Sequence, residues 1–67
     1  MRKFYRWFPS GYYLDLSEPD LHILKRPDDS MVAAFFPEAA EKETLQRTAH
    51  EDYWEQSENL TNSEPNV

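Results

Sequence analysis

The 67-residue chain contains no cysteine and only one glycine, and it has no long hydrophobic run. The lack of cysteine excludes disulfides and thiolate metal sites, and a single glycine excludes a glycine-rich phosphate loop. No apolar stretch approaches the roughly 20 residues of a membrane-spanning helix, and none follows the basic N-terminus as in a secretory signal. Small extracellular domains usually depend on disulfides. The sequence therefore predicts a cytoplasmic protein without a membrane span.

Negative charge is concentrated in the second half of the sequence. The net charge is −6, yet residues 1–36 carry five basic and five acidic side chains, whereas residues 37–67 carry two basic and eight acidic ones. An acidic half repels nucleic-acid phosphate and favours a basic partner, although it also serves simply to keep a helix soluble. Nucleic acid is therefore not the expected partner.

Two apolar runs joined by a turn, within residues 21–36, predict a β-hairpin around which the fold is organised. Pro27 suits the first central position of a type I turn, and the two aspartates after it can accept hydrogen bonds from nearby backbone amides. Arg26 and Met31 would flank this four-residue loop. Residues 31–36 are apolar on both faces, which is typical of a strand covered on both sides or placed in the middle of a sheet.

Two further segments before the hairpin predict strands. Residues 3–8 are rich in aromatic side chains and would place Phe4, Arg6 and Phe8 on one face of a strand, with Phe4 and Phe8 directed into the core. Residues 12–16 alternate as in a half-buried strand. Gly11, between the two, is the best candidate for a backbone conformation that other residues avoid. Strands in this order favour an antiparallel meander.

The segment that follows the hairpin predicts a helix over residues 38–56. Pro37 is favoured at the first position of a helix, and the residues after it are mostly good helix formers. The inward stripe would consist of Leu45, Ala49 and Tyr53.

These elements predict one α+β domain over residues 1–56 and a disordered acidic tail over residues 57–67. The domain would be a three- or four-stranded antiparallel β-meander with one C-terminal helix packed on one face. A chain of this length removes only about 60% of its unfolded surface from water. Its core is therefore expected to be small.

The polar residues form no catalytic or ligand-binding pattern. The serines fall in predicted turns or in the tail, and the two histidines, His22 and His50, lack a partner at metal-binding spacing. The HExxH pattern fails because Trp54 occupies its last position. We therefore expect a non-enzymatic protein with no metal, cofactor or small-molecule substrate.

One helix covers one face of a sheet, and this leaves the other face with more large apolar side chains than a monomer usually exposes. The sequence therefore predicts a protein-interaction module, acting as a homodimer or as an adaptor or regulator of a larger partner. The side chains available to the open face are Tyr5, Trp7, Tyr13, Leu24, Val32 and Phe36. All of these except Leu24, together with Trp54 on the helix, are the candidate partner-binding residues.

The alternative is a nucleic-acid-linked regulator. The acidic half would then act as a mimic that occupies a basic site on a nucleic-acid-binding partner, or the basic and aromatic residues of the N-terminal strand would bind RNA weakly. RNA binding would depend on Arg2, Lys3 and Arg6 and would weaken steeply with salt. No pattern in the sequence identifies a family.

Overall fold

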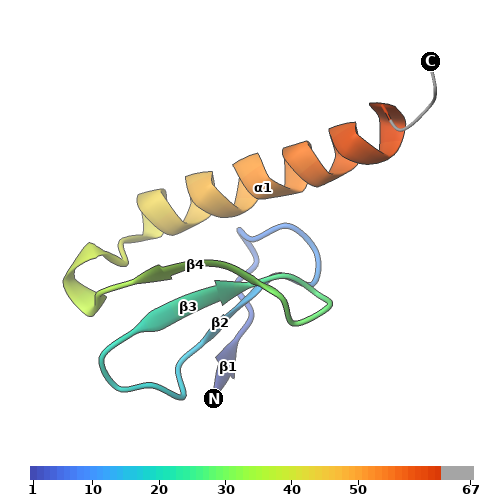
Figure 1. Ribbon diagram of the computed structural model, residues 1–67. Helices are drawn as coiled ribbons and strands as arrows, with labels where there is room; N and C mark the ends of the chain where they lie inside the picture. The colour runs from blue at the N-terminus through green and yellow to red at the C-terminus, as the bar shows by residue number, and fades with distance from the viewer. Residues whose placement is uncertain (63–67) are drawn as a thin grey trace.

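The computed structural model describes residues 1–62, which form a four-stranded antiparallel sheet with one helix across a single face (Figure 1). The sheet order follows the sequence: β1 (Arg2–Lys3), β2 (Tyr13–Asp15), β3 (His22–Lys25) and β4 (Met31–Phe35). A short 3-10 helix, η1 (Pro37–Ala39), leads into α1 (Lys42–Asn62). The predicted α+β meander with a C-terminal helix is confirmed.

The N-terminal strand is much shorter than predicted, because residues 3–8 do not stay extended. Only the two residues of β1 pair with β2, and the chain then turns so that the Phe8 N–H donates to the Tyr5 carbonyl at 3.1 Å. The turn stacks the rings of Tyr5 and Trp7 at 4.4 Å and sets Phe8 edge-on to both. Phe8 reaches the core as predicted, but Phe4 is 61% exposed because it precedes the turn.

The hairpin turn closes one residue earlier than predicted. The Asp29 N–H donates to the Arg26 carbonyl at 2.8 Å, which makes Pro27 the first central residue of the turn, and the Arg26 N–H donates to the Ser30 carbonyl at 2.9 Å. Asp29 takes the left-handed conformation at φ 75°, which aspartate tolerates better than most residues. The Asp28 carboxylate accepts from the Ser30 N–H at 3.0 Å, as the turn chemistry predicts.

Gly11 takes the special backbone conformation that the sequence predicts for it, with φ 88°. The hairpin turn also lies against it, because a Cβ added at Gly11 would come within 2.7 Å of the Cγ of Pro27 and 2.9 Å of its Cβ. Both the positive φ and this close approach require glycine here.

Helix α1 is displaced along the chain from its predicted position. It begins at Lys42, four residues late, because Pro37–Ala39 form a 3-10 turn and Ala40 leaves the helical conformation at ψ 60°. It ends at Asn62, so the predicted start of the tail falls inside the helix. The rest of the predicted tail, residues 63–67, lies outside the described residues.

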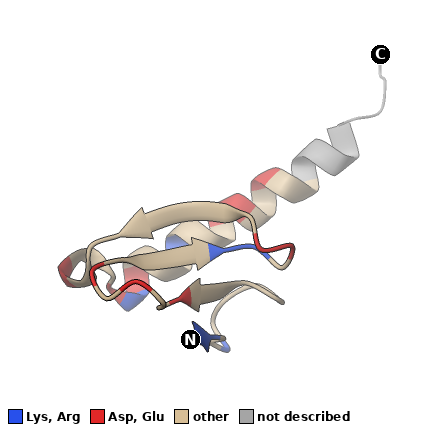
Figure 2. Ribbon diagram, turned by 60° about the horizontal axis from the view of Figure 1, so that its bottom comes forward, with Lys and Arg blue, Asp and Glu red and all other residues tan. Residues whose placement is uncertain are grey.

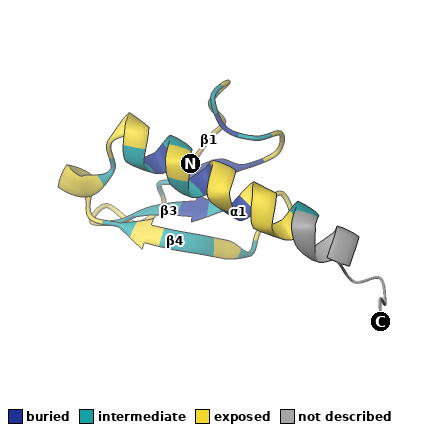
Figure 3. Cartoon of the chain, turned by 90° about the horizontal axis from the view of Figure 1, so that it is seen from above, coloured by how far each residue is buried: buried dark blue, intermediate teal, exposed yellow. Residues whose placement is uncertain are grey.

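The core lies between α1 and the sheet (Figure 3). Leu14 and Leu24 are opposite each other on β2 and β3 and are almost fully buried. Leu24 therefore faces the helix and not the open face to which its alternation in the sequence assigned it. The buried residues of this cluster are Phe8, Tyr12, Leu14, Leu24, Leu45 and Ala49.

The buried stripe of α1 differs from the prediction at its third position. Leu45 and Ala49 are buried as expected, but Tyr53 is 46% exposed and Asp52 is only 8% exposed. A helix advances 3.6 residues per turn, so either residue could follow Ala49 on the inner side. The structure places the carboxylate there because it has partners on the sheet.

Candidate functional site

Three of the predicted partner-binding residues pack against the core instead of lining an open face. Tyr5 and Trp7 are half-buried against it because of the N-terminal turn. Val32 is also half-buried against the core, next to a register irregularity in the pairing of β3 with β4. These side chains are therefore chiefly part of the fold.

Tyr13 does lie on the face away from the helix, but it is buried there with 2% exposure. The Phe4 ring lies 5.1 Å from its ring, and the Arg2 guanidinium lies over it at 5.0 Å. Its hydroxyl donates to the Asp29 carboxylate at 2.5 Å, and this hydrogen bond raises the pKa of Tyr13. The prediction that Tyr13 is open to a partner is wrong because the N-terminal residues fold over it.

Phe36 and Trp54 are the predicted candidates that stay exposed, by 66% and 63% respectively. Phe36 directly follows β4, whereas Trp54 belongs to α1. Met31, at the start of β4, is 59% exposed and was not among the candidates. Exposed apolar side chains therefore lie at both ends of β4, and Met1 and Phe4, which flank β1 at the opposite edge, are exposed as well.

β4 forms an edge of the sheet, so the alternative of a strand in the middle of the sheet is wrong. It pairs only with β3, and no described segment lies beyond it when the sheet is viewed from the helix side (Figure 3). β4 contains no charged residue and no proline, which are the usual protections of an edge strand. The opposite edge, β1, is two residues long and both of them are basic. The two edges therefore differ in their capacity to accept another strand.

Acidic residues border β4 at both ends (Figure 2). Asp28 and Asp29 lie in the turn before it, and Glu38 lies in η1 after it. The cations of β3 and of the turn that follows it are neutralised, since Lys25 pairs with Asp15 at 3.0 Å and Arg26 pairs with a carboxylate of α1.

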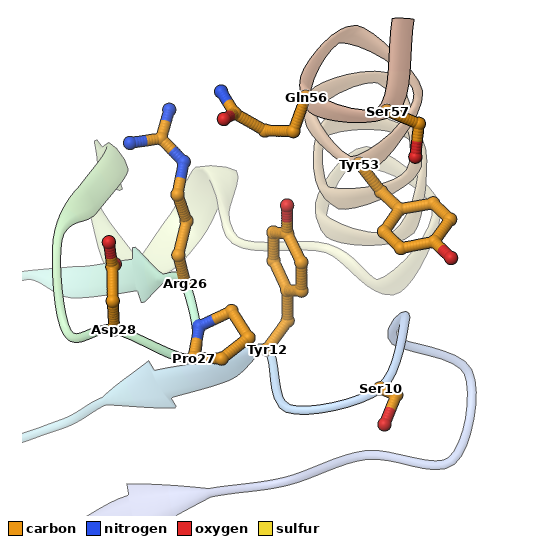
Figure 4. A pocket seen from close by; sticks show the side chains of 8 residues that line it. All are labelled: Ser10, Tyr12, Arg26, Pro27, Asp28, Tyr53, Gln56 and Ser57. Carbon is orange, nitrogen blue, oxygen red and sulfur yellow. The ribbon is translucent and has the colours of Figure 1, made fainter. Parts of the chain in front are cut away.

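A cleft of about 330 Å³ separates the hairpin turn from α1 (Figure 4). Arg26 and Pro27 line it from the turn, Tyr12 lines it from the strand side, and Tyr53 and Gln56 line it from the helix.

A hydrogen-bonded cluster at this cleft joins three distant segments of the chain. The Asp52 carboxylate accepts from the Tyr12 hydroxyl at 2.6 Å and from Nε and Nη2 of Arg26 at 2.9 and 2.8 Å. Arg26 also donates to the Ser30 hydroxyl at 3.1 Å. This cluster was not predicted, because residues so far apart cannot be paired from one sequence. The only available signal was an acid near the apolar stripe of the helix.

The protonation states in this cluster are fixed around neutral pH. Hydrogen bonds from Arg26 hold the pKa of Asp52 below its ordinary value, even though burial acts in the opposite direction. Burial, and then the hydrogen bond to Asp52, raise the pKa of Tyr12 well above its ordinary value. A general acid or base needs a pKa near the working pH. The cluster is therefore suited to holding α1 on the sheet.

The two histidines lie on different elements. Nε2 of His50 lies 3.1 Å from the Trp7 carbonyl, and His22 lies opposite Phe35 in the sheet. Among the side chains that the structure describes, those of residues 1–57, no group of three histidine or acidic residues is placed to hold a metal ion. No helix in this part of the chain is both long and apolar enough to cross a membrane.

The chain was compared with family models, curated proteins and solved structures, and none of the three comparisons gives a match.

Proposed function

We propose that this protein is a non-enzymatic protein-interaction module that binds its partner along β4. The observation that carries the proposal is the unpaired, uncharged edge of β4, with Met31 and Phe36 exposed beside it. An extended peptide can add to such an edge, with the backbone hydrogen bonds providing affinity and the adjacent side chains providing specificity.

The apolar side chains along this edge make binding energetically reasonable. Fully burying a methionine or phenylalanine side chain contributes about 1.5–3 kcal/mol, and both Met31 and Phe36 are more than half exposed in the free chain. A contact of one strand and two anchors is small, as in transient complexes. The protein would therefore bind its partner reversibly, as an adaptor or regulator.

Peptides selected from a displayed library of random dodecapeptides should bind at β4. We expect Met31→Thr combined with Phe36→Ser to lower the affinity for these peptides by about tenfold or more, because two side chains that the peptide would bury are lost. Fluorescence anisotropy with labelled peptides measures the change. Both side chains are exposed, so circular dichroism should show an intact fold.

The matched control is Trp54→Ser, which removes an equally exposed aromatic from α1 and should leave the binding of these peptides unchanged. Light scattering on the same samples measures self-association. A strictly monomeric protein for which no peptide ligand is found would overturn the proposed function.

A second candidate, weak RNA binding, is favoured by one observation at the other end of the molecule. Nζ of Lys42 lies 5.5 Å from the Trp7 ring, and Nζ of Lys3 lies 6.0 Å from the stacked Tyr5 ring. Arg6 is exposed within the same turn. Cations next to aromatic rings are the elements of a single-strand binding surface.

If this candidate is right, a labelled uridine dodecanucleotide should bind at low salt and dissociate as salt rises. Changing Lys3, Arg6 and Lys42 together to alanine should then lower the affinity by about tenfold or more, because three phosphate contacts are lost. Arg47→Ala, which removes a cation elsewhere on α1, is the control. Absence of binding at low salt contradicts RNA recognition, and an acidic mimic would likewise bind no RNA.

A further inference from the structure

We infer that β4 accepts an extended segment of a partner protein that has apolar side chains at alternate positions and lysine or arginine beyond each end. This inference rests on the proposed function and names the chemistry of the partner.

The alternation follows from how the side chains of β4 are distributed. Val32 and Phe35 pack toward the core on the helix side, whereas Met31, Ala34 and Phe36 are exposed. A strand added next to β4 extends the sheet, so its side chains alternate between these two sides. Apolar residues on one side would cover Met31 and Phe36, and residues on the other side would continue the surface formed by Val32 and Phe35.

The basic ends follow from the charges at the ends of β4. Asp28 precedes the uncharged run and Glu38 follows it, and both are exposed. Hydrogen bonds from Ser30 lower the pKa of Asp28, so this carboxylate is ionised at neutral pH. Lys25 and Arg26, the cations of the adjacent strand and turn, are already paired with Asp15 and Asp52. The edge therefore presents a neutral centre with a negative charge at each end.

The same charges disfavour a second copy of the chain as the occupant. Antiparallel pairing of two β4 strands about Ala33, the middle of the strand, places Asp28 of one copy opposite Glu38 of the other at both ends. Like charges directly opposite each other destabilise a strand pair, and each chain carries a net charge of −6. A basic segment removes both penalties.

Two labelled peptides with the same centre test this inference. The peptide Lys-Lys-Val-Thr-Val-Thr-Val-Lys-Lys should bind at least about tenfold more tightly than the same peptide with glutamate at the four end positions, and its advantage should shrink as salt rises. Backbone N-methylation blocks strand addition without changing the side chains. Methylating one set of alternate residues should abolish binding, whereas methylating the other set should leave it intact.

A charge-matched pair of variants locates the contact. Asp28→Asn combined with Glu38→Gln removes one negative charge at each end and keeps an acceptor for Ser30. This double change should lower the affinity for the lysine-ended peptide by about fivefold, as expected for the loss of two exposed ion pairs. Glu51→Gln combined with Glu55→Gln makes the same change in net charge on exposed residues of α1 and should have no effect beyond general screening.

Equal affinity for the two peptides, or tolerance of methylation at both sets of positions, would overturn the inference. The wild-type protein could also form a stable dimer that the combined Met31→Thr and Phe36→Ser change dissociates. That result would assign the edge to a second copy and overturn this inference, while the proposed function would stand. If library peptides bind at β4 but carry no basic ends, only this inference fails. If there is neither a peptide ligand nor a dimer, both fail.

Discussion

Replacing Asp52 by asparagine lowers the free energy of unfolding by about 2–3 kcal/mol. The carboxylate is 8% exposed and accepts three hydrogen bonds, two of them from one guanidinium. Removing one member of a fully buried ion pair costs about 3–5 kcal/mol, but the Arg26 side chain is 28% exposed and is partly rehydrated, which reduces the loss. A single core of this size provides only about 3–5 kcal/mol. Urea unfolding followed by circular dichroism should therefore show a large shift of the midpoint.

Glu51→Gln is the matched control, because it neutralises an exposed acid on the same helix and should shift the midpoint little. Acid provides a second comparison. Because Arg26 lowers the pKa of Asp52 in the folded protein, the stabilisation is complete above the pKa of the unfolded carboxyl, about 4, and is lost as the pH falls through the folded value. Wild type and Asp52→Asn should therefore converge in acid. Equal midpoints at neutral pH would contradict a role of Asp52 in stability.

Replacing Gly11 by alanine lowers the free energy of unfolding by about 3 kcal/mol. A left-handed conformation costs an alanine about 1–2 kcal/mol, and Gly11 has φ 88°. The added methyl group also meets Pro27 at 2.7 and 2.9 Å, which forces a shift that typically costs about 1–3 kcal/mol. The same urea titration measures the effect.

A double-mutant cycle with Pro27→Gly separates the two causes. This second change removes both Pro27 atoms that the new methyl group would meet, so the loss caused by Gly11→Ala should fall to about 1–2 kcal/mol in that background. If the loss is the same in both backgrounds, contact with Pro27 is not its cause.

The parts of the fold that depend on local chemistry could be predicted from the sequence. Pro27 and the aspartates after it specify the turn, and a lone glycine at position 11 marks a special backbone conformation. Helical spacing also identified Leu45 and Ala49 as buried. In each case the residues that determine the local conformation lie within a few positions of it in the sequence.

The candidate site could be predicted only in part, because it depends on contacts between distant residues. Phe36 was identified as exposed, but the apolar pattern of β4 suggested covered faces and did not show that the strand lies at an edge. The alternation at the N-terminus suggested a strand, whereas packing of Tyr5 and Trp7 on the core outweighs that preference. Asp52 is one of several acidic residues on α1, and nothing near it in sequence reveals Arg26 as its partner.

The order of the sheet also determines how much chain entropy each step of assembly costs. Every strand pairs with its neighbour in sequence, so the sheet needs to close only the short connections 4–12, 16–21 and 26–30. Docking α1 joins Tyr12 to Asp52, which are 40 residues apart. Because the strands between them are already paired when α1 docks, the connection that remains to be closed is residues 36–41, and each doubling of a loop costs only about 0.6 kcal/mol more to close. The hydrogen bonds of Asp52 thus offset the entropy lost when the two halves of the chain are joined.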